Sequence, residues 1–270
     1  MNVRIAGDGP AAEAVAAALA DTDAQPERVD PDGIAGADLA VVVGPTGDDA
    51  LATANEAADG PWLAVELGGV GGYPVAGVDA AVTGLAPGQG CFDCLRARVG
   101  SNASETDDGS VDRPTARLAG AVAGSEAAAA VGDADETTVD DLVGSIHELP
   151  HEDRRFLPVP GCCGTTDDEL RREHAAVSLD EAVERAECTL DPRVGLVSDI
   201  GELESFPAPY YLATTAETSV YSDASAPGQA AGVADDWNAA FMKAVGEALE
   251  RYSAAIYRNS EFERAPPGMV

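Results

Sequence analysis

The sequence predicts an α/β protein that begins with a Rossmann-like parallel sheet carrying helices on both faces. Three apolar runs have the length and the β-branched content of buried strands, at 2–6 (NVRIA), 37–43 (ADLAVVV) and 62–67 (WLAVEL). Alanine-rich helical segments follow the first two runs, at 13–20 and 48–58. Strands that alternate with helices form a parallel sheet, because each helix carries the chain back across the sheet to the next strand.

The connection after the first strand, 7–12 (GDGPAA), has the GxGxxA pattern of a dinucleotide-binding turn. Glycine at such a turn lets the backbone approach a pyrophosphate at a helix N-terminus. Pro10 removes one N–H, the third position is alanine, and Asp30 is a poor candidate for the acid that binds a ribose. A structural tight turn is therefore the favoured interpretation of 7–12, and nucleotide binding is the alternative.

The elements expected between residues 68 and 185 follow from amino-acid composition and from the periodicity of apolar residues. We expect a glycine-rich break at 68–72, an extended segment at 75–85, an acidic loop at 101–113 and a helix suited to close packing at 115–131. A short element at 135–149 and an exposed connecting helix at 165–185 complete this part of the chain.

The net charge of −32 arises from 48 acidic and 16 basic residues among 270, and Lys243 is the only lysine. Such a surface repels nucleic acid and anionic membranes, so neither is an expected partner. Hydrophobic residues make up 45% of the chain and recur periodically, which favours a folded protein over a disordered one. An acidic excess with scarce lysine and abundant alanine is typical of halophilic proteins, which work in molar salt that screens their charge.

The sequence has neither a signal peptide nor an apolar run near 18 residues, so we expect a cytoplasmic protein without a membrane span. Five cysteines in such a chain favour free thiols or a metal site over disulfides. Cys188 stands alone and is predicted to be buried in the core, whereas His174 is predicted to lie on the surface. Cys91 and Cys94 have the CxxC spacing of a metal knuckle, which redox pairs also share.

The whole string around them, 84–98 (GLAPGQGCFDCLRAR), resembles the P-G…C-x-x-C-L-x-x-R motif of ThiF/E1-like domains. In many of these domains a second cysteine pair completes a structural zinc site, and 154–164 (RRFLPVPGCCG) is similar to that second half. The resemblance implies a zinc ligand set of Cys91, Cys94, Cys162 and Cys163. A set of three cysteines with a histidine, His151, is a second reading, and buried apolar roles for Cys162 and Cys163 are a third. A closed site of four protein ligands stabilises the fold and does not catalyse.

The segment 235–258 (DDWNAAFMKAVGEALERYSAAIYR) predicts a long amphipathic helix capped by Asp235 or Asp236. Its apolar stripe comprises Trp237, Phe241, Ala244, Val245, Ala248, Leu249, Tyr252 and Ile256. Glu247 and Glu250 project from another face, one turn apart, with Arg251 beside them. By spacing alone this is a solvated face with i,i+4 pairs from Lys243 through Glu247 to Arg251.

The string 244–252 (AVGEALERY) resembles the SxxExxER signature of the YcaO family, with Ala244 in place of the serine. The preceding 226–243 is similar to the family's glycine-containing lead-in, although 228–230 (GQA) departs from its GkG pattern. Upstream, 188–203 resembles the opening strand of a YcaO domain, and 207–218 reads as a further strand. The resemblance implies an α/β ThiF/E1-like domain at 1–178, followed at 186–270 by the start of an α+β YcaO domain.

The YcaO resemblance implies ATP-dependent modification of a peptide or protein backbone amide. Proteins of this family activate the amide oxygen by phosphorylation, and a side chain or an external sulfur source then attacks. Glu247 and Glu250 would hold Mg²⁺ against the triphosphate, and Arg251 would neutralise phosphate charge. The products would be azolines or thioamides, in bacteriocin-like peptide biosynthesis, or the chain would assist ribosomal-protein methylthiolation.

The acidic segments that follow this helix in the family do not appear in the 19 residues after Arg251. We therefore expect a C-terminally incomplete YcaO domain that is inactive alone and has a separate YcaO half, or a second copy in a homodimer, as a partner. A substrate-presenting scaffold without catalysis is one alternative function. An E1-like adenylating enzyme that uses 7–12 is another.

Overall fold

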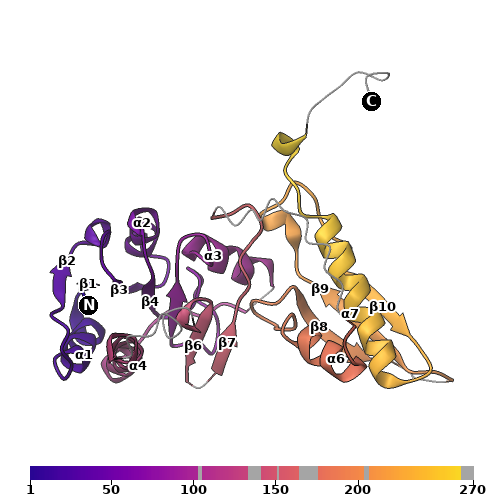
Figure 1. The fold of residues 1–270 in the computed structure, drawn as a ribbon, viewed down its shortest axis with the longest axis horizontal. Helices are drawn as coiled ribbons and strands as arrows, with labels where there is room; N and C mark the ends of the chain where they lie inside the picture. Colours follow the sequence, from indigo (N-terminus) through magenta and orange to yellow (C-terminus); the bar gives the residue numbers. More distant parts are fainter. Residues whose placement is uncertain (103–104, 133–140, 151, 164–175, 204–206, 263–270) are drawn as a thin grey trace. The chain divides into compact units, whose positions relative to one another are not determined.

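A computed structural model describes residues 1–102, 105–132, 141–150, 152–163, 176–203 and 207–262 of the chain (Figure 1). The chain divides into two compact units, Met1–Asp168 and Glu169–Val270. Each unit builds its own sheet and its own hydrophobic core. None of the helices in the described ranges is both long enough and apolar enough to cross a membrane.

The first unit contains a seven-stranded sheet in the order β2-β1-β3-β4-β5-β6-β7. Its strands are β1 (Val3–Ala6), β2 (Glu27–Val29), β3 (Leu39–Pro45), β4 (Trp62–Leu67), β5 (Ala80–Leu85), β6 (Ser145–Leu149) and β7 (Glu152–Arg155). The first four are parallel, which confirms the α/β prediction, and the last three run antiparallel. No helix lies between β4 and β5, so the chain turns back beside β4 instead of crossing over the sheet.

Helices cover both faces of this sheet. One face carries α1 (Gly9–Leu19) and α4 (Arg113–Gly132), and the other carries α2 (Asp49–Ala57) and α3 (Phe92–Ser101) (Figure 1). Consecutive residues of β3 divide between the faces: Val43 packs into the core beneath α1 and α4, whereas Gly44 faces Leu51 of α2. Trp62 of β4 contacts Phe92 of α3 on the second face, with 6.5 Å between ring centroids.

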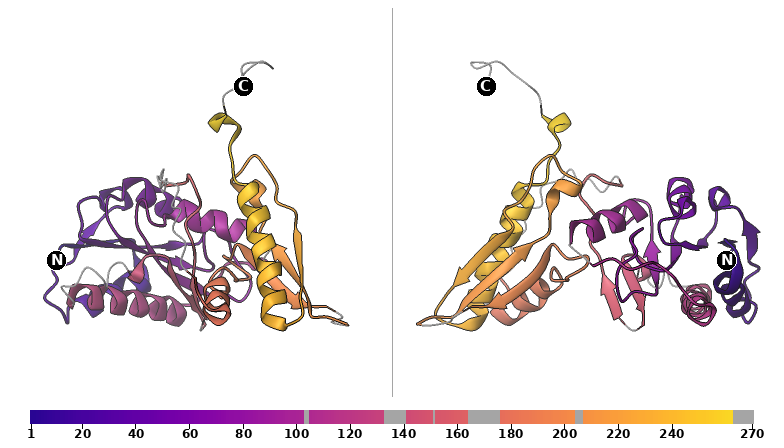
Figure 2. Two further views of the ribbon diagram at one scale, coloured as in Figure 1. Left: turned by 45° about the vertical axis from the view of Figure 1, so that its right-hand side comes forward. Right: turned by 180° about the vertical axis from the view of Figure 1, so that it is seen from behind.

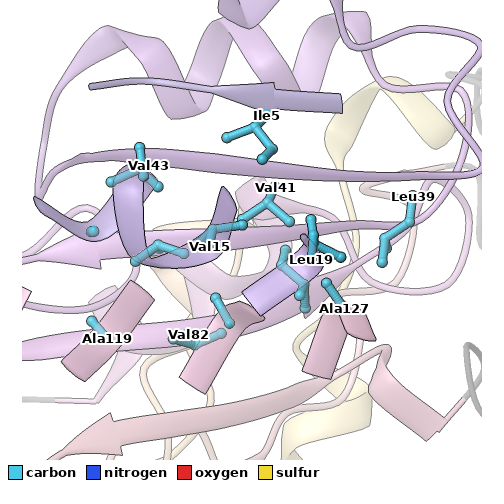
Figure 3. Close-up of a cluster of buried hydrophobic side chains, with 14 of the residues drawn as sticks. Ile5, Val15, Leu19, Leu39, Val41, Val43, Val82, Ala119 and Ala127 are labelled. Atoms are coloured by element: carbon cyan, nitrogen blue, oxygen red, sulfur yellow. The ribbon is translucent and has the colours of Figure 1, made fainter. Parts of the chain in front are cut away.

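The core beneath α1 and α4 consists mainly of valine, isoleucine and leucine from the strands and of alanine, together with Val15 and Leu19, from the helices (Figure 3). The predicted close packing of the alanine-rich helix is confirmed. A Cβ on Gly120 would lie 2.1 Å from the Ala11 carbonyl oxygen, and one on Gly124 would lie 2.6 Å from the Ala18 Cβ. Only glycine at these two positions lets α4 lie this close to α1.

The second unit packs two helices with a three-stranded antiparallel sheet of order β10-β9-β8. Its elements are α6 (Leu179–Glu187), β8 (Val197–Glu202), β9 (Tyr210–Thr215), β10 (Gln229–Val233) and α7 (Trp237–Ala254). Both views of Figure 2 show α7 lying along this sheet. Ala244 and Ala248 of α7 pack against Ala213 of β9, which buries the predicted apolar face of the helix.

The structure confirms some of the predictions for α7 and β10 and contradicts others. Asp236 caps α7 as expected, because its carboxylate accepts a hydrogen bond from the Ala239 N–H at 2.9 Å. Trp237 belongs to the predicted apolar stripe, yet 46% of its surface is exposed. It begins the helix, and its ring makes an edge-type contact with Tyr211. Strand β10 was not predicted, because the short residues of QAAGV carry no strand pattern.

The prediction for Cys188 is wrong. This residue caps the C-terminus of α6, a helix that is largely exposed to water. Its side chain is therefore exposed as well and does not reach the core. Its thiol donates to the Glu184 carbonyl oxygen, with 3.6 Å between sulfur and oxygen. Within the described part of the expected connecting helix, Leu179–Glu187 form α6, and His174 lies outside the described residues.

Candidate functional site

Four cysteines from two distant parts of the chain meet at the start of α3. Cys91 is the residue before the first turn of α3, and Cys94 lies within that turn, so both sulfurs are held at one end of a rigid element. Cys162 and Cys163 belong to a turn in which the Cys162 N–H donates to the Val159 carbonyl oxygen at 3.1 Å. The structure thus brings together all four cysteines that the sequence singled out.

The sulfurs of Cys91, Cys94 and Cys162 all lie within 4.8 Å of one another, which is a spacing that suits a metal centre. The Sγ atom of Cys91 lies 3.6 Å from that of Cys94 and 3.7 Å from that of Cys162, and the sulfurs of Cys94 and Cys163 are 3.6 Å apart. A disulfide would require about 2.05 Å. Four thiolates bound to zinc at about 2.3 Å stand at the corners of a tetrahedron whose edges are about 3.8 Å. The sulfurs of Cys91, Cys94 and Cys162 therefore fit a zinc ion in both spacing and chemistry, and the sulfur of Cys163 contacts this group through Cys94.

The burial of the four cysteines bears on the alternative roles that the sequence left open for Cys162 and Cys163. Cys91 and Cys94 are buried, whereas Cys162 and Cys163 are half-buried and face the first pair. The interpretation of the second pair as buried apolar residues is wrong, because both residues are only half-buried. His151, the alternative fourth ligand, lies outside the described residues.

Contacts within the cluster shift the pKa values of its cysteines in opposite directions. Contacts with Cys162 and then Cys94 hold the pKa of Cys91 well below its usual range. The pKa of Cys94 is raised, first by its contact with Cys162, and burial raises that of Cys163. A metal ion must displace the remaining protons, so its affinity for the cluster rises with pH.

Asn55 links the start of α3, where the cysteines lie, to α2, and the sequence did not single it out. This residue of α2 accepts a hydrogen bond from the Phe92 N–H at 2.8 Å and donates to the Asp93 carboxylate at 3.0 Å. The side chain of Asn55 thus caps α3 from another helix and satisfies an N–H that has no partner within α3. No local pattern could reveal it, because 37 residues separate Asn55 from Phe92.

The residues assigned to ATP and magnesium lie along α7. Glu247 forms an i,i+4 ion pair with Arg251, and each side chain is a little over one third exposed. Arg251 also donates to the Gln229 carbonyl oxygen of β10 at 2.5 Å. Glu250 is exposed. Lys243 was expected to pair with Glu247, but its ammonium group donates instead to the Val233 carbonyl oxygen at 2.9 Å. The structure brings Glu247 and Arg251 together and leaves Glu250 in solvent.

This arrangement suits a metal–phosphate complex in its chemistry. Magnesium uses one or two carboxylates together with phosphate oxygens, and a guanidinium binds phosphate in the same way as it binds a carboxylate. Glu247 and Arg251 now neutralise each other. A nucleotide would therefore have to replace Glu247 as the partner of Arg251.

The turn at 7–12 borders a cavity of about 650 Å³ lined by Gly7, Asp8, Arg28, Val29, Asp30 and Pro31. Gly7 has a φ of +98°, and a Cβ there would lie 2.2 Å from the Val43 carbonyl oxygen. Close contact with β3 therefore accounts for this glycine without a ligand. The Arg28 guanidinium donates to the carbonyl oxygens of Gly7 and Ala12 at 2.9 and 2.8 Å, and two carboxylates line the cavity, which disfavours phosphate.

Glu66 of β4 is a fully buried carboxylate that the sequence did not single out. Its two oxygens accept hydrogen bonds from the N–H groups of Gly71 and Gly72 at 2.6 and 2.7 Å, which closes the glycine-rich turn after the strand. Burial outweighs these hydrogen bonds and raises the pKa of Glu66 to about 7.

The stability contribution of Glu66 should change with pH. Because the pKa of this carboxyl is raised on folding, the folded state keeps its proton after the unfolded chain has lost it. The contribution is fully present below pH 4.5 and is lost as pH rises through about 7, a total of about 3 kcal/mol. The free energies of unfolding of the wild type and of Glu66→Gln, compared between pH 5 and 8, measure it. A difference between the two proteins that stays constant with pH would contradict the raised pKa.

No family model matches this sequence, and no curated protein matches it either. The solved structures that are similar to it include two heterocyclases. The structure described as "Heterocyclase in complex with substrate and Cofactor" matches 94% of this chain and 39% of its own length, with a TM-score of 0.60 and 18% identity. "Structure of the heterocyclase TruD" matches 73% of this chain and 33% of its own, with a TM-score of 0.45 and 21% identity.

The first similarity establishes a shared fold. Because it covers 94% of the chain, the matched region includes residues of both compact units. The chain spans about two fifths of the length of that heterocyclase. What the two units have in common with that structure is their arrangement of helices and strands.

Proposed function

We propose that this chain is part of an ATP-dependent enzyme that modifies peptide backbones, of the YcaO type. The first unit would be a ThiF/E1-like module, and the second unit would be the opening part of the YcaO domain. The observation that carries the proposal is the fold similarity to a substrate-bound heterocyclase over 94% of the chain. The helix α7 adds support, since its AVGEALERY string resembles the family signature.

The proposed reaction converts a backbone amide next to Cys, Ser or Thr into an azoline. The side-chain sulfur or oxygen attacks the amide carbon, and the amide oxygen leaves as phosphate that derives from ATP. Glu247 and Glu250 would bind the Mg²⁺ that accompanies the nucleotide, and Arg251 would bind its phosphates. With an external sulfur source the same activation would yield a thioamide.

The first unit would present the peptide or protein substrate and would contain a structural zinc ion. Cys91, Cys94, Cys162 and Cys163 would hold it, which the distances of 3.6–3.7 Å between their sulfurs support. Zinc bound by four thiolates supplies stability and no chemical step. Its effect would be to fasten the segment that carries the second pair to α3.

A non-catalytic scaffold is the second candidate. The observation that favours it is the ion pair between Glu247 and Arg251, which keeps both side chains engaged with each other. In this case the chain would present a peptide to a separate, catalytic YcaO half. The adenylating alternative is disfavoured, because Pro10 and the two acids beside the 7–12 turn oppose a triphosphate.

Calorimetric titration with Mg-ATP in 2 M KCl tests the proposal. The wild type is expected to bind, and Glu247→Gln is expected to weaken binding at least about tenfold, because a carboxylate ligand of magnesium is lost. The matched control is Glu181→Gln, which breaks a similar i,i+4 pair with Arg185 on α6 of the same unit. It should bind Mg-ATP as the wild type does.

Three results would decide against the proposal. Binding that is lost in Gly9→Val and kept in Glu247→Gln would favour the adenylating enzyme. The absence of Mg-ATP binding would favour the scaffold. Equal weakening by Glu181→Gln and Glu247→Gln would mean that the unit responds to any broken surface pair and that α7 has no special role.

A further inference from the structure

Arg98 is an almost completely buried cation that the proposed function does not use. It lies in α3, and only 1% of its surface is exposed. Its Nε–H donates to the Leu157 carbonyl oxygen and an Nη2–H donates to the Pro158 carbonyl oxygen, both at 2.8 Å. Arginine stays charged when buried, so its burial is costly unless it makes strong hydrogen bonds.

The two carbonyl groups belong to the segment that delivers the second cysteine pair. The next residue, Val159, donates its N–H to the Cys94 sulfur at 3.3 Å, and the turn from Val159 to Cys162 follows at once. Cys94 and Arg98 are four residues apart, so they lie on the same side of α3. This side of the helix therefore holds one strip of chain at three successive residues.

We propose that Arg98 is a positioning residue for the metal centre, which rests on the proposed zinc site. Its guanidinium holds the backbone of Leu157 and Pro158 so that Cys162 and Cys163 reach the sulfurs on α3. Its positive charge, one helical turn from Cys94, offsets the charge that four thiolates keep after binding a divalent ion. Groups that orient metal ligands commonly contribute about 10–100-fold to metal affinity.

Zinc affinity of the full chain, measured by chelator competition at fixed pH, tests this role. Arg98→Gln is expected to weaken zinc binding about 10–100-fold. Arg98→Lys keeps the positive charge but cannot form both hydrogen bonds of the guanidinium. Its affinity for zinc should lie between those of Arg98→Gln and the wild type. The matched control is Arg28→Gln, since Arg28 also donates to two backbone carbonyl oxygens of the same unit, at 2.9 and 2.8 Å. It should bind zinc as the wild type does.

The outcomes separate this inference from the zinc site itself. A wild type that binds no zinc removes the metal centre and the inference with it. A wild type that binds zinc, together with Arg98→Gln that is less stable but equally tight for zinc, overturns the inference alone, because Arg98 would then serve only packing. If Arg98→Gln does not fold, the decision falls to Arg98→Lys, and wild-type affinity in that variant overturns the proposal.

Discussion

Replacing Cys91 with serine is expected to remove zinc from the protein and to lower its free energy of unfolding by more than about 3 kcal/mol. Cys91 contacts both Cys94 and Cys162, so its loss breaks the link between α3 and the second cysteine pair. A hydroxyl is a poor substitute for a thiolate as a zinc ligand. Metal content of the purified protein and denaturant unfolding, with and without chelator, measure both effects.

Cys188→Ser is the control for this substitution, because Cys188 is exposed and lies in the other unit. It should leave zinc content and stability unchanged. Wild-type protein stripped by chelator should unfold as easily as Cys91→Ser does. The proposed metal centre would be contradicted if the protein purifies without metal and its melting temperature responds neither to added zinc nor to the Cys91 substitution.

Raising KCl from 0.1 M to 2 M is expected to raise the midpoint of thermal unfolding by more than about 10 °C. The chain carries a net charge of −32, so its carboxylates repel one another in the folded state. The Debye length falls from about 10 Å at 0.1 M to about 3 Å at 1 M, which screens this repulsion. Calorimetry or circular dichroism as a function of salt provides the measurement.

A charge-reduced variant separates screening from the general effect of salt on apolar groups. Glu13, Asp21, Asp23 and Asp32 are exposed, and replacing them with the corresponding amides removes four negative charges from the first unit. The variant should be more stable than the wild type at 0.1 M KCl, and its melting should depend less on salt. Equal salt dependence in the two proteins would rule out charge repulsion as the cause.

Local spacing was enough to predict the features that depend on neighbours in the chain. The cap at Asp236, the apolar face with Ala244 and Ala248, and the ion pair between Glu247 and Arg251 all follow from the helical repeat. The parallel strands β1, β3 and β4 follow from apolar runs separated by helical segments. Features at the ends of elements were predicted less well, as the exposed Trp237 and Cys188 illustrate.

The surroundings of Glu66 could not be predicted, although its strand could. The run WLAVEL indicates a buried strand, but the pattern does not predict which groups form hydrogen bonds with Glu66 near the end of that strand. In the structure Glu66 accepts from Gly71 and Gly72, and no sequence period links a carboxylate to a turn of that shape. Antiparallel pairing of β5 escaped prediction for a similar reason, because it depends on the missing crossover helix.

The sequence by itself determined the elements, the excess of acid and the two cysteine pairs, because each is written in adjacent residues or in composition. Only the tertiary structure decided that Cys91 and Cys162, 71 residues apart, lie 3.7 Å from each other, and that Arg98 holds the strip of chain between them. The physical reason is that spacing along a helix or strand is set by local backbone geometry. Contact between distant segments depends instead on how whole elements pack, which no short stretch of sequence encodes.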